Sequence, residues 1–342
     1  MTEPFITVII TAHNRKEFIT KAILSVLNQD LEREKFEVLI VKNFNDIEID
    51  NFIKIENLSN IYTESVSLGK KLALGVKKSK GKVISFLEDD DLWTRDKLMA
   101  VMEHFTEDPS IGYYKHSIAF IDKDGIELSP SSSFRFPSKL DAFNKFDNYN
   151  VSKILSLLKT GAGYHLSSMS IRRDILLNFI SVIESTNIGL DLLMLFFAIE
   201  TKSISMTDSR ALCFYRLHNS SSNDLQNYNT FIASKQKLFS GALESMLTAI
   251  DYFKLDSLKL VILDIIANYK FYYSLITLDD NITVLERLKS LKFSIRVRDI
   301  TGLLVFALFI PQVGRRKRPL GDLFRRIYFL MLREFYRGLG II

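Results

Sequence analysis

The sequence predicts an α/β protein with a mostly parallel sheet flanked by helices, followed by a helical C-terminal region. Short β-branched and apolar runs, typical of buried strands, cover residues 5–10, 36–41 and 82–87. Between them, apolar residues recur at helical spacing over residues 19–27 and 68–76. Strands that alternate with helices indicate a parallel sheet, which binds its ligands at the carboxyl ends of its strands.

Later segments continue these patterns. We expect helices after Trp93 to about residue 105 and over residues 151–158 and 190–199, with a strand over residues 167–171. Near the N-terminus, Asn14 followed by Glu17 resembles a helix-capping pair.

The composition changes after a serine-rich stretch near residue 220. From residue 228 to 291 glycine and proline are almost absent, and apolar residues recur at helical spacing. We therefore predict three parts: an α/β domain over residues 1–225, a helical appendage over residues 226–300 and a distinct tail over residues 301–342.

The positive charge of the chain is concentrated in that tail, where residues 315–337 hold eight basic and two acidic side chains. Its apolar residues share one helical face, opposite Arg326, Arg333 and Arg337; they are Leu320, Leu323, Phe324, Ile327, Met331 and Phe335. This layout predicts an interfacial helix on a membrane with anionic lipids and argues against nucleic-acid binding. The alternative is a helix that packs on its own protein or on a second subunit, so a homo-oligomer is possible.

The sequence favours a cytoplasmic protein. The single cysteine, Cys213, cannot form an internal disulfide, and the opening residues lack the basic start and long apolar run of a signal peptide. The apolar run over residues 303–310 is far shorter than the roughly 20 residues that a membrane-spanning helix needs. We expect a peripheral protein on the inner face of the cell membrane.

Four consecutive carboxylates, Glu88, Asp89, Asp90 and Asp91, follow the strand predicted over residues 82–87. Like charges repel, so a divalent cation or a helix N-terminus is expected to compensate them. In the second case Asp91 would cap the next helix.

Several motifs occur in an order that resembles the family 2 glycosyltransferases. They are Thr11-Ala12-His13-Asn14-Arg15, Ser25 to Gln29, Lys80-Gly81, Leu87 to Trp93, Ser168 to Arg173, Asp191 at a helix start, and Tyr215-Arg216-Leu217-His218. The resemblance covers residues 5 to about 222. It implies a GT-A fold and transfer of a sugar, with inversion, from a nucleotide-diphosphate sugar to an acceptor hydroxyl.

The resemblance also implies roles for individual residues. Asp90, Asp91 and His218 would bind a divalent metal, Mn²⁺ or Mg²⁺, which stabilises the departing nucleoside diphosphate. Asp191 would be the general base that takes the acceptor proton. The predicted nucleotide-sugar-binding residues are Thr11, Ala12, His13, Asn14, Arg15, Asn43, Lys71, Glu88, Asp89 and Arg216.

The chain departs from the family pattern at three places. Residues 42–45 replace an acidic motif that contacts the base, and Leu72-Ala73 replaces Arg-Asn. Asn43 could still bond a base edge, and Lys71 or its neighbour Lys70 could supply the missing charge. Leu190 replaces the acid that usually precedes the base.

The sequence as a whole predicts a glycosyltransferase docked on the cytoplasmic membrane face, with a glycan or polyprenyl-linked acceptor. Two alternatives remain open. A metal-dependent nucleotidyl- or phosphotransferase would use the same acidic cluster without needing Asp191 as a base. A catalytically degenerate domain would bind nucleotide and act as a membrane-docked partner.

Overall fold

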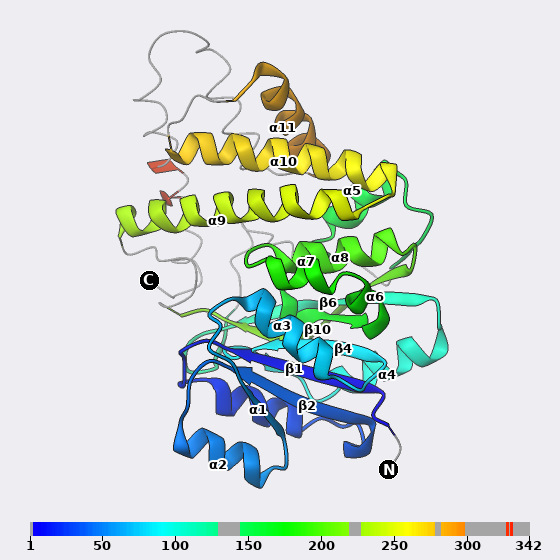
Figure 1. Ribbon diagram of the computed structural model, residues 1–342, viewed down its shortest axis with the longest axis vertical. Helices are drawn as coiled ribbons and strands as arrows, with labels where there is room; N and C mark the ends of the chain where they lie inside the picture. The colour runs from blue at the N-terminus through cyan, green and yellow to red at the C-terminus, as the bar shows by residue number, and fades with distance from the viewer. Residues whose placement is uncertain are drawn as a thin grey trace. The chain divides into compact units, whose positions relative to one another are not determined.

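The computed structural model describes residues 3–128, 144–218, 227–277 and 282–297, together with 326–327 and 329–330. The chain divides into two compact units: Met1–Glu127, Phe136–Tyr149 and Thr160–Arg216 form the first, and Leu128–Arg135, Asn150–Lys159 and Leu217–Ile342 the second. Figure 1 labels the elements of each. The predicted boundaries at residues 225 and 300 lie outside the described residues and stay predictions.

A mixed, mostly parallel sheet forms the first unit, which confirms the predicted fold class. Its strands run in the order β3-β2-β1-β4-β9-β6-β10-β5, with β7 beside β6 and β8 beside β10. β1 pairs in parallel with β2 and with β4, and β2 pairs in parallel with β3, whereas β9 is antiparallel to β4 and β6. The strands are β1 Ile6–Ala12, β2 Phe36–Lys42, β3 Ser59–Tyr62, β4 Val83–Glu88, β5 Leu92–Trp93, β6 Ile111–Ile121, β7 Glu127–Leu128, β8 Asn144–Phe146, β9 Met169–Arg172 and β10 Ile204–Arg216.

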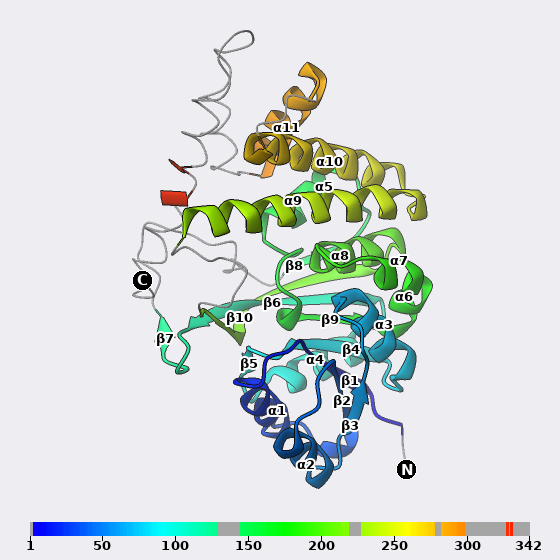
Figure 2. The ribbon, with the colours of Figure 1, turned by 60° about the vertical axis from the view of Figure 1, so that its left-hand side comes forward.

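Helices cover both faces of this sheet. Figures 1 and 2 show α3, α6, α7 and α8 together on one side. On the other side lie α1 and α4, where the Leu98 amide of α4 donates to Oε1 of Gln29, two residues after the end of α1, at 2.8 Å. The helices are α1 Ile19–Leu27, η1 Arg33–Lys35, α2 Ile47–Ile55, α3 Leu68–Lys78, α4 Lys97–Glu107, η2 Leu166–Ser168, α6 Arg173–Asn178, α7 Ile180–Ser185 and α8 Leu190–Glu200.

The carboxyl ends of β1, β2 and β4 meet at one edge of the sheet. Ala12 is in register with Lys42, and Thr11 with Glu88. The strands are held there by buried β-branched and apolar side chains, as the sequence pattern predicts. The residues that directly follow these strands are therefore neighbours in space.

The predicted cap at Asn14 is wrong, and so is the alternative in which Asp91 caps a helix. Helix α1 begins at Ile19 after Phe18, without a side-chain cap, whereas Asn14 has a left-handed backbone with φ of 54°. Asn tolerates this conformation because its short polar side chain bonds nearby backbone. Helix α4 begins after Asp96, so Asp91 does not cap it.

The second unit is helical, as predicted for residues 228–291. It contains α5 Val151–Lys159, α9 Tyr228–Ala249, η3 Ile250–Tyr252, α10 Asp256–Thr277 and α11 Val284–Val297. Its apolar cluster comprises Phe239, Phe271, Tyr272, Leu275, Ile276 and Ile282. Helix α11 is held to α10 by the Ser290 hydroxyl, which donates to Asn268 Oδ1 at 2.8 Å.

Most of the predicted tail, residues 301–342, lies outside the described residues. Of its described part, Phe329 is buried against Tyr228 and Phe231 of α9, and the Arg326 guanidinium lies 5.7 Å from the Tyr228 ring centre. Among the described helices, α10 alone has the length and composition to cross a membrane, but 56% of its apolar window is buried within the protein. That burial is typical of a core helix.

Candidate active site

Polar side chains gather where β1, β2 and β4 end. The Asn14 amide donates to Asn43 Oδ1 at 3.1 Å, and Asn43 Nδ2 donates back to Asn14 Oδ1 at 3.1 Å. The His13 amide donates to Asp89 Oδ2 at 3.3 Å. Segments far apart in the sequence thus meet at the predicted edge of the sheet.

Arg15 compensates part of the charge of the acidic cluster. Its guanidinium lies 2.5 Å from Asp89 Oδ1 and 2.6 Å from Asp90 Oδ2. Burial of the guanidinium lowers the pKa of Arg15, but the two carboxylates raise it by more, so the pKa is raised overall. Burial also raises the pKa of Asp89 to about 6, although Arg15 opposes that shift. The repulsion among the four carboxylates is therefore relieved partly within the protein.

Asp91 is the buried anchor of the cluster. The Ser167 hydroxyl donates to its Oδ2 at 2.5 Å, and the Arg216 amide donates to its Oδ1 at 3.1 Å. Arg216 also donates from Nε to the Asp90 carbonyl at 2.8 Å. Its Nη1 donates to the carbonyls of Asp122 and Lys123, both at 3.0 Å. The Arg216 side chain thus braces the loop that carries Asp90 and Asp91.

His165 joins this cluster, although no sequence spacing singles it out. Its Nε2 lies 3.0 Å from Asp91 Oδ2 and 3.8 Å from Glu88 Oε2. Burial lowers the pKa of His165, but Asp91 beside it raises the pKa overall. Burial raises the pKa of Glu88, although the nearby imidazole of His165 opposes that shift. The Tyr215 ring meets the imidazole edge-on, with 4.6 Å between ring centres.

Asp191 lies in the first turn of α8 and is connected to the cluster through His165. Its Oδ2 accepts the His165 amide at 3.2 Å, and its Oδ1 accepts the Leu192 amide at 3.0 Å. Burial raises the pKa of Asp191, while these two amides oppose the shift. Gly189 occupies the N-cap, so Asp191 is not the cap of α8. Leu190 is buried in the core, at the position where the family pattern has an acid.

Lys71 lies beneath the ends of β1 and β2. Its ammonium donates to the Ala12 carbonyl at 2.8 Å, and it lies 3.1 Å from His13 Nδ1 and 3.4 Å from Asn43 Oδ1. The side chain is 1% exposed, and burial lowers the pKa of Lys71 to about 8. Helix α3 is fixed here by close packing, because a Cβ on Gly69 would lie 1.9 Å from the Thr186 carbonyl oxygen.

We expect Lys71→Met to weaken donor binding without stopping the reaction. The substitution removes an ammonium that holds Asn43 and the end of β1, so the donor KM should rise about tenfold with a small change in kcat. In the unsubstituted protein, the same KM should rise as the pH passes above about 8, where Lys71 loses its charge. Lys70→Met, at an exposed neighbour on the same helix, is the matched control. Equal KM values for the two variants would contradict this role.

Comparison with known proteins identifies the family. Residues 7–176, which include all of β1 but its first residue and every strand from β2 to β9, match the model of the family described as Glycosyl transferase family 2. The chain belongs to glycosyl transferase family 2. A protein of Rickettsia bellii (strain RML369-C), described as an uncharacterized glycosyltransferase, is 31% identical over 135 residues. That match covers 38% of this chain and spans only 19% of the length of the relative.

Solved structures of other proteins have the same fold. S. aureus TarS 1-349 in complex with UDP-GlcNAc aligns with a TM-score of 0.55 and 16% identity, covering 98% of this chain and 92% of that one. The mannosyltransferase PcManGT from Pyrobaculum calidifontis, in complex with GDP-Man and Mn²⁺, also aligns with a TM-score of 0.55. It is 14% identical, and the match covers 98% of this chain and 83% of that one. At such identities the likeness establishes the fold alone.

The acidic cluster of this family 2 domain suits a hard cation. Glu88 and Asp90 have the accessible carboxylates, with side chains 34% and 12% exposed, against 3% for Asp89 and 0% for Asp91. Carboxylate oxygens are the ligands that Mg²⁺ and Mn²⁺ prefer. The donor set therefore fits the predicted metal, and the predicted ligand Asp90 is one of its two accessible carboxylates.

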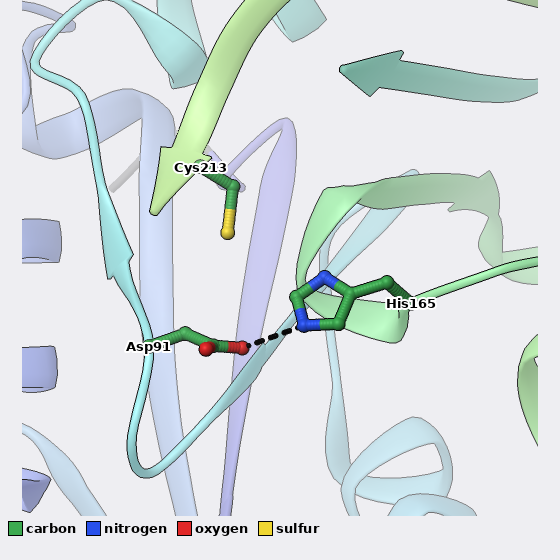
Figure 3. A group of neighbouring side chains, drawn as sticks. All are labelled: Asp91, His165 and Cys213. Carbon is green, nitrogen blue, oxygen red and sulfur yellow. Dashed lines mark ion pairs between the residues drawn. The ribbon is translucent and has the colours of Figure 1, made fainter. Parts of the chain in front are cut away.

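A second group, Asp91, His165 and Cys213, offers three ligand atoms within 4.8 Å of one another (Figure 3). The chemistry around it disfavours a cation. Both Asp91 oxygens already accept hydrogen bonds, and Lys97 and Lys115 are buried nearby and interact electrostatically with Cys213. Burial raises the pKa of Cys213, which keeps the thiol protonated. We interpret the group as an ion pair beside a buried thiol.

The remaining predicted residues have these places. Thr11 and Ala12 are buried at the end of β1, where the Ala12 carbonyl accepts from Lys71. His218 comes two residues after β10, at the start of the second unit, and its ring is partly buried. The part of His218 in metal binding, like that of Arg216 in diphosphate binding, stays a prediction.

Proposed function

We propose that this protein is a metal-dependent, inverting glycosyltransferase that uses a nucleotide-diphosphate sugar. The observation that carries the proposal is the position of Asp191, whose carboxylate has a raised pKa. This carboxylate accepts the backbone amide of His165, and the imidazole of His165 lies beside Asp91 in the acidic cluster. A leaving-group site and a base are the two parts that direct displacement by an acceptor hydroxyl requires.

The residues divide into three roles. Asn43, Lys71 and the backbone at His13 and Asn14 would hold the nucleotide, since they line the ends of β1 and β2. A divalent cation on Asp90 would stabilise the negative charge that develops on the departing diphosphate. Metal binding by Asp91 and by His218 stays a prediction from the sequence.

The third role belongs to the base. Asp191 would accept the proton of the acceptor hydroxyl as that oxygen attacks the anomeric carbon. A carboxyl group with a raised pKa is a stronger base than an ordinary aspartate, which favours this transfer. The His165 and Leu192 amides hold the carboxylate in one orientation.

The donor is a UDP- or GDP-sugar in this proposal, because the solved neighbours were crystallised with UDP-GlcNAc and with GDP-Man. Calorimetric titration with UDP and GDP, each with and without Mn²⁺, tests donor binding directly. We expect one of the two to bind more tightly with Mn²⁺ and expect Asp90→Asn to reduce this gain in affinity. Binding that is identical with and without Mn²⁺ would contradict the metal site.

We also propose that the protein acts at the cytoplasmic membrane face on a glycan or polyprenyl-linked acceptor. The contacts of Phe329 and Arg326 with α9 engage one side of the tail helix. In the helix that the sequence predicts for the tail, at 100° per residue, Ile327 and Met331 would fall on the opposite face. An apolar face flanked by arginines is suited to anionic lipid.

Flotation with liposomes that contain phosphatidylglycerol tests the membrane proposal. We expect the full chain to float and Ile327→Glu/Met331→Glu to lose most of its binding, because each change places a charge in the apolar face. Ile47→Glu/Ile55→Glu is the matched control, since these residues of α2 are 81% and 79% exposed. Equal flotation of the two double variants would contradict the membrane proposal.

A further inference from the structure

The turn at residues 161–168 lies between the acidic cluster and helix α8. Three backbone features place it there. His165 has φ of 74°, a left-handed conformation that costs a non-glycine residue about 1–3 kcal/mol. Gly161 also has positive φ, at 75°. A Cβ on Gly163 would lie 2.6 Å from Leu192 Cδ1, so the turn packs directly on α8.

Hydrogen bonds attach one side of this turn to the acidic cluster. The Glu88 amide donates to Ser167 Oγ at 3.0 Å, and that hydroxyl donates to Asp91 at 2.5 Å. Trp93 Nε1 and Lys97 Nζ donate to the Ser167 carbonyl at 2.7 and 2.9 Å. The segment that carries the carboxylates and the turn therefore form one connected body.

The other side of the turn is attached to Asp191 by a single residue. The His165 amide donates to Asp191 Oδ2, while the imidazole of the same residue lies 3.0 Å from Asp91 Oδ2 (Figure 3). The left-handed backbone of His165 accompanies this double contact. Burial of the ring on Tyr215 leaves it little freedom to leave Asp91.

We infer that His165 is a positioning residue that couples the leaving-group carboxylates to the base. Its ring holds the turn on Asp91, and its amide sets the orientation of the Asp191 carboxylate. We therefore expect donor binding at the acidic cluster to order the base as well. The inference rests on the proposed function, because it takes Asp191 as the base.

Kinetics of His165 variants provide the first test, with the donor that the binding experiment selects. His165→Leu keeps the bulk and removes the polar ring, so transfer kcat should fall about 100-fold with donor KM within about threefold. His165→Gln, which retains an amide nitrogen near the place of Nε2, should recover most of that loss. A raised donor KM with unchanged kcat would overturn the inference.

A double-mutant cycle separates positioning of the base from general damage. In an Asp191→Glu background the carboxylate is already displaced by one methylene group, so His165→Leu should have a much smaller effect than in the unsubstituted protein. Equal fold losses in the two backgrounds would show that His165 acts independently of the base and would overturn the inference. If Asp191→Asn alone retains full transfer, the proposed base is wrong instead.

Amide hydrogen exchange tests the coupling without turnover. On addition of UDP or GDP with Mn²⁺, we expect slower exchange in residues 189–194 of the unsubstituted protein. We expect His165→Leu to bind the nucleotide but to lose this protection, and His165→Gln to restore it. Protection that persists in His165→Leu, or is absent from the unsubstituted protein, would overturn the inference. Failure of both nucleotides to bind would refute the proposed donor site first, and the coupling with it.

Discussion

Replacement of Asp191 by asparagine is expected to reduce sugar transfer by about 10²–10⁴-fold, the usual contribution of a general base. Asparagine keeps the size of the side chain and still accepts the His165 amide, so folding and donor binding should change little. Single-turnover transfer, together with donor binding measured by calorimetry, separates the two effects.

The pH dependence of the same step follows from the raised pKa of Asp191. The carboxylate acts as a base only when it has lost its proton, so transfer should increase as the pH rises through this pKa. Because burial raises that pKa above the ordinary value of an aspartate, the increase should lie at higher pH than for an exposed aspartate. In Asp191→Asn this acid limb should be absent.

Asp174→Asn is the matched control, because Asp174 also lies in the first turn of a helix and accepts its neighbour's amide, from Ile175 at 2.9 Å. It should retain normal transfer. Full sugar transfer by Asp191→Asn would contradict the role of Asp191 as the general base.

Replacement of Asp90 by asparagine is expected to lower kcat/KM by about 10²–10³-fold, comparable with the loss of one strong electrostatic contact to a developing anion. The substitution removes one negative charge from the cluster and weakens the contact with Arg15. It should therefore raise the Mn²⁺ concentration needed for half-maximal activity, and added Mn²⁺ should restore part of the rate. Chelation with EDTA should stop the reaction in the unsubstituted protein.

Asp124→Asn, at a mostly exposed side chain in the same unit, controls for the loss of one negative charge. It should leave the Mn²⁺ dependence unchanged. If Asp90→Asn has the same Mn²⁺ dependence as this control, Asp90 is not a metal ligand.

The elements predicted correctly are those whose apolar pattern is local. β1, β2 and β4 are continuous buried runs, and α8 is an apolar helix whose start the Gly189-Leu190-Asp191 sequence indicates. β6 and β10 were not predicted, because polar residues such as Lys115, His116 and Asp208 interrupt their patterns. These side chains are buried within the fold, which a periodicity argument cannot anticipate.

Part of the candidate site was predictable for a related reason. Residues that directly follow parallel strands must meet at one edge, so the acidic cluster was placed there from its position alone. Asn43 was predicted from the family resemblance. His165 was not, since its contacts with Asp91 and Asp191 arise from a left-handed turn that no motif marks. The Gly161-Ala162-Gly163 sequence before it is the one local signal that could have indicated that turn.

The most direct test is turnover of a nucleotide sugar. Purified full-length protein would be incubated with Mn²⁺ or Mg²⁺, a membrane lipid extract as acceptor source, and a panel of nucleotide sugars that begins with UDP-GlcNAc and GDP-Man. Our account predicts metal-dependent release of nucleoside diphosphate from at least one donor, abolished by EDTA and strongly reduced in Asp90→Asn and Asp191→Asn. No release from any donor, with either metal and with lipid extract present, would contradict it.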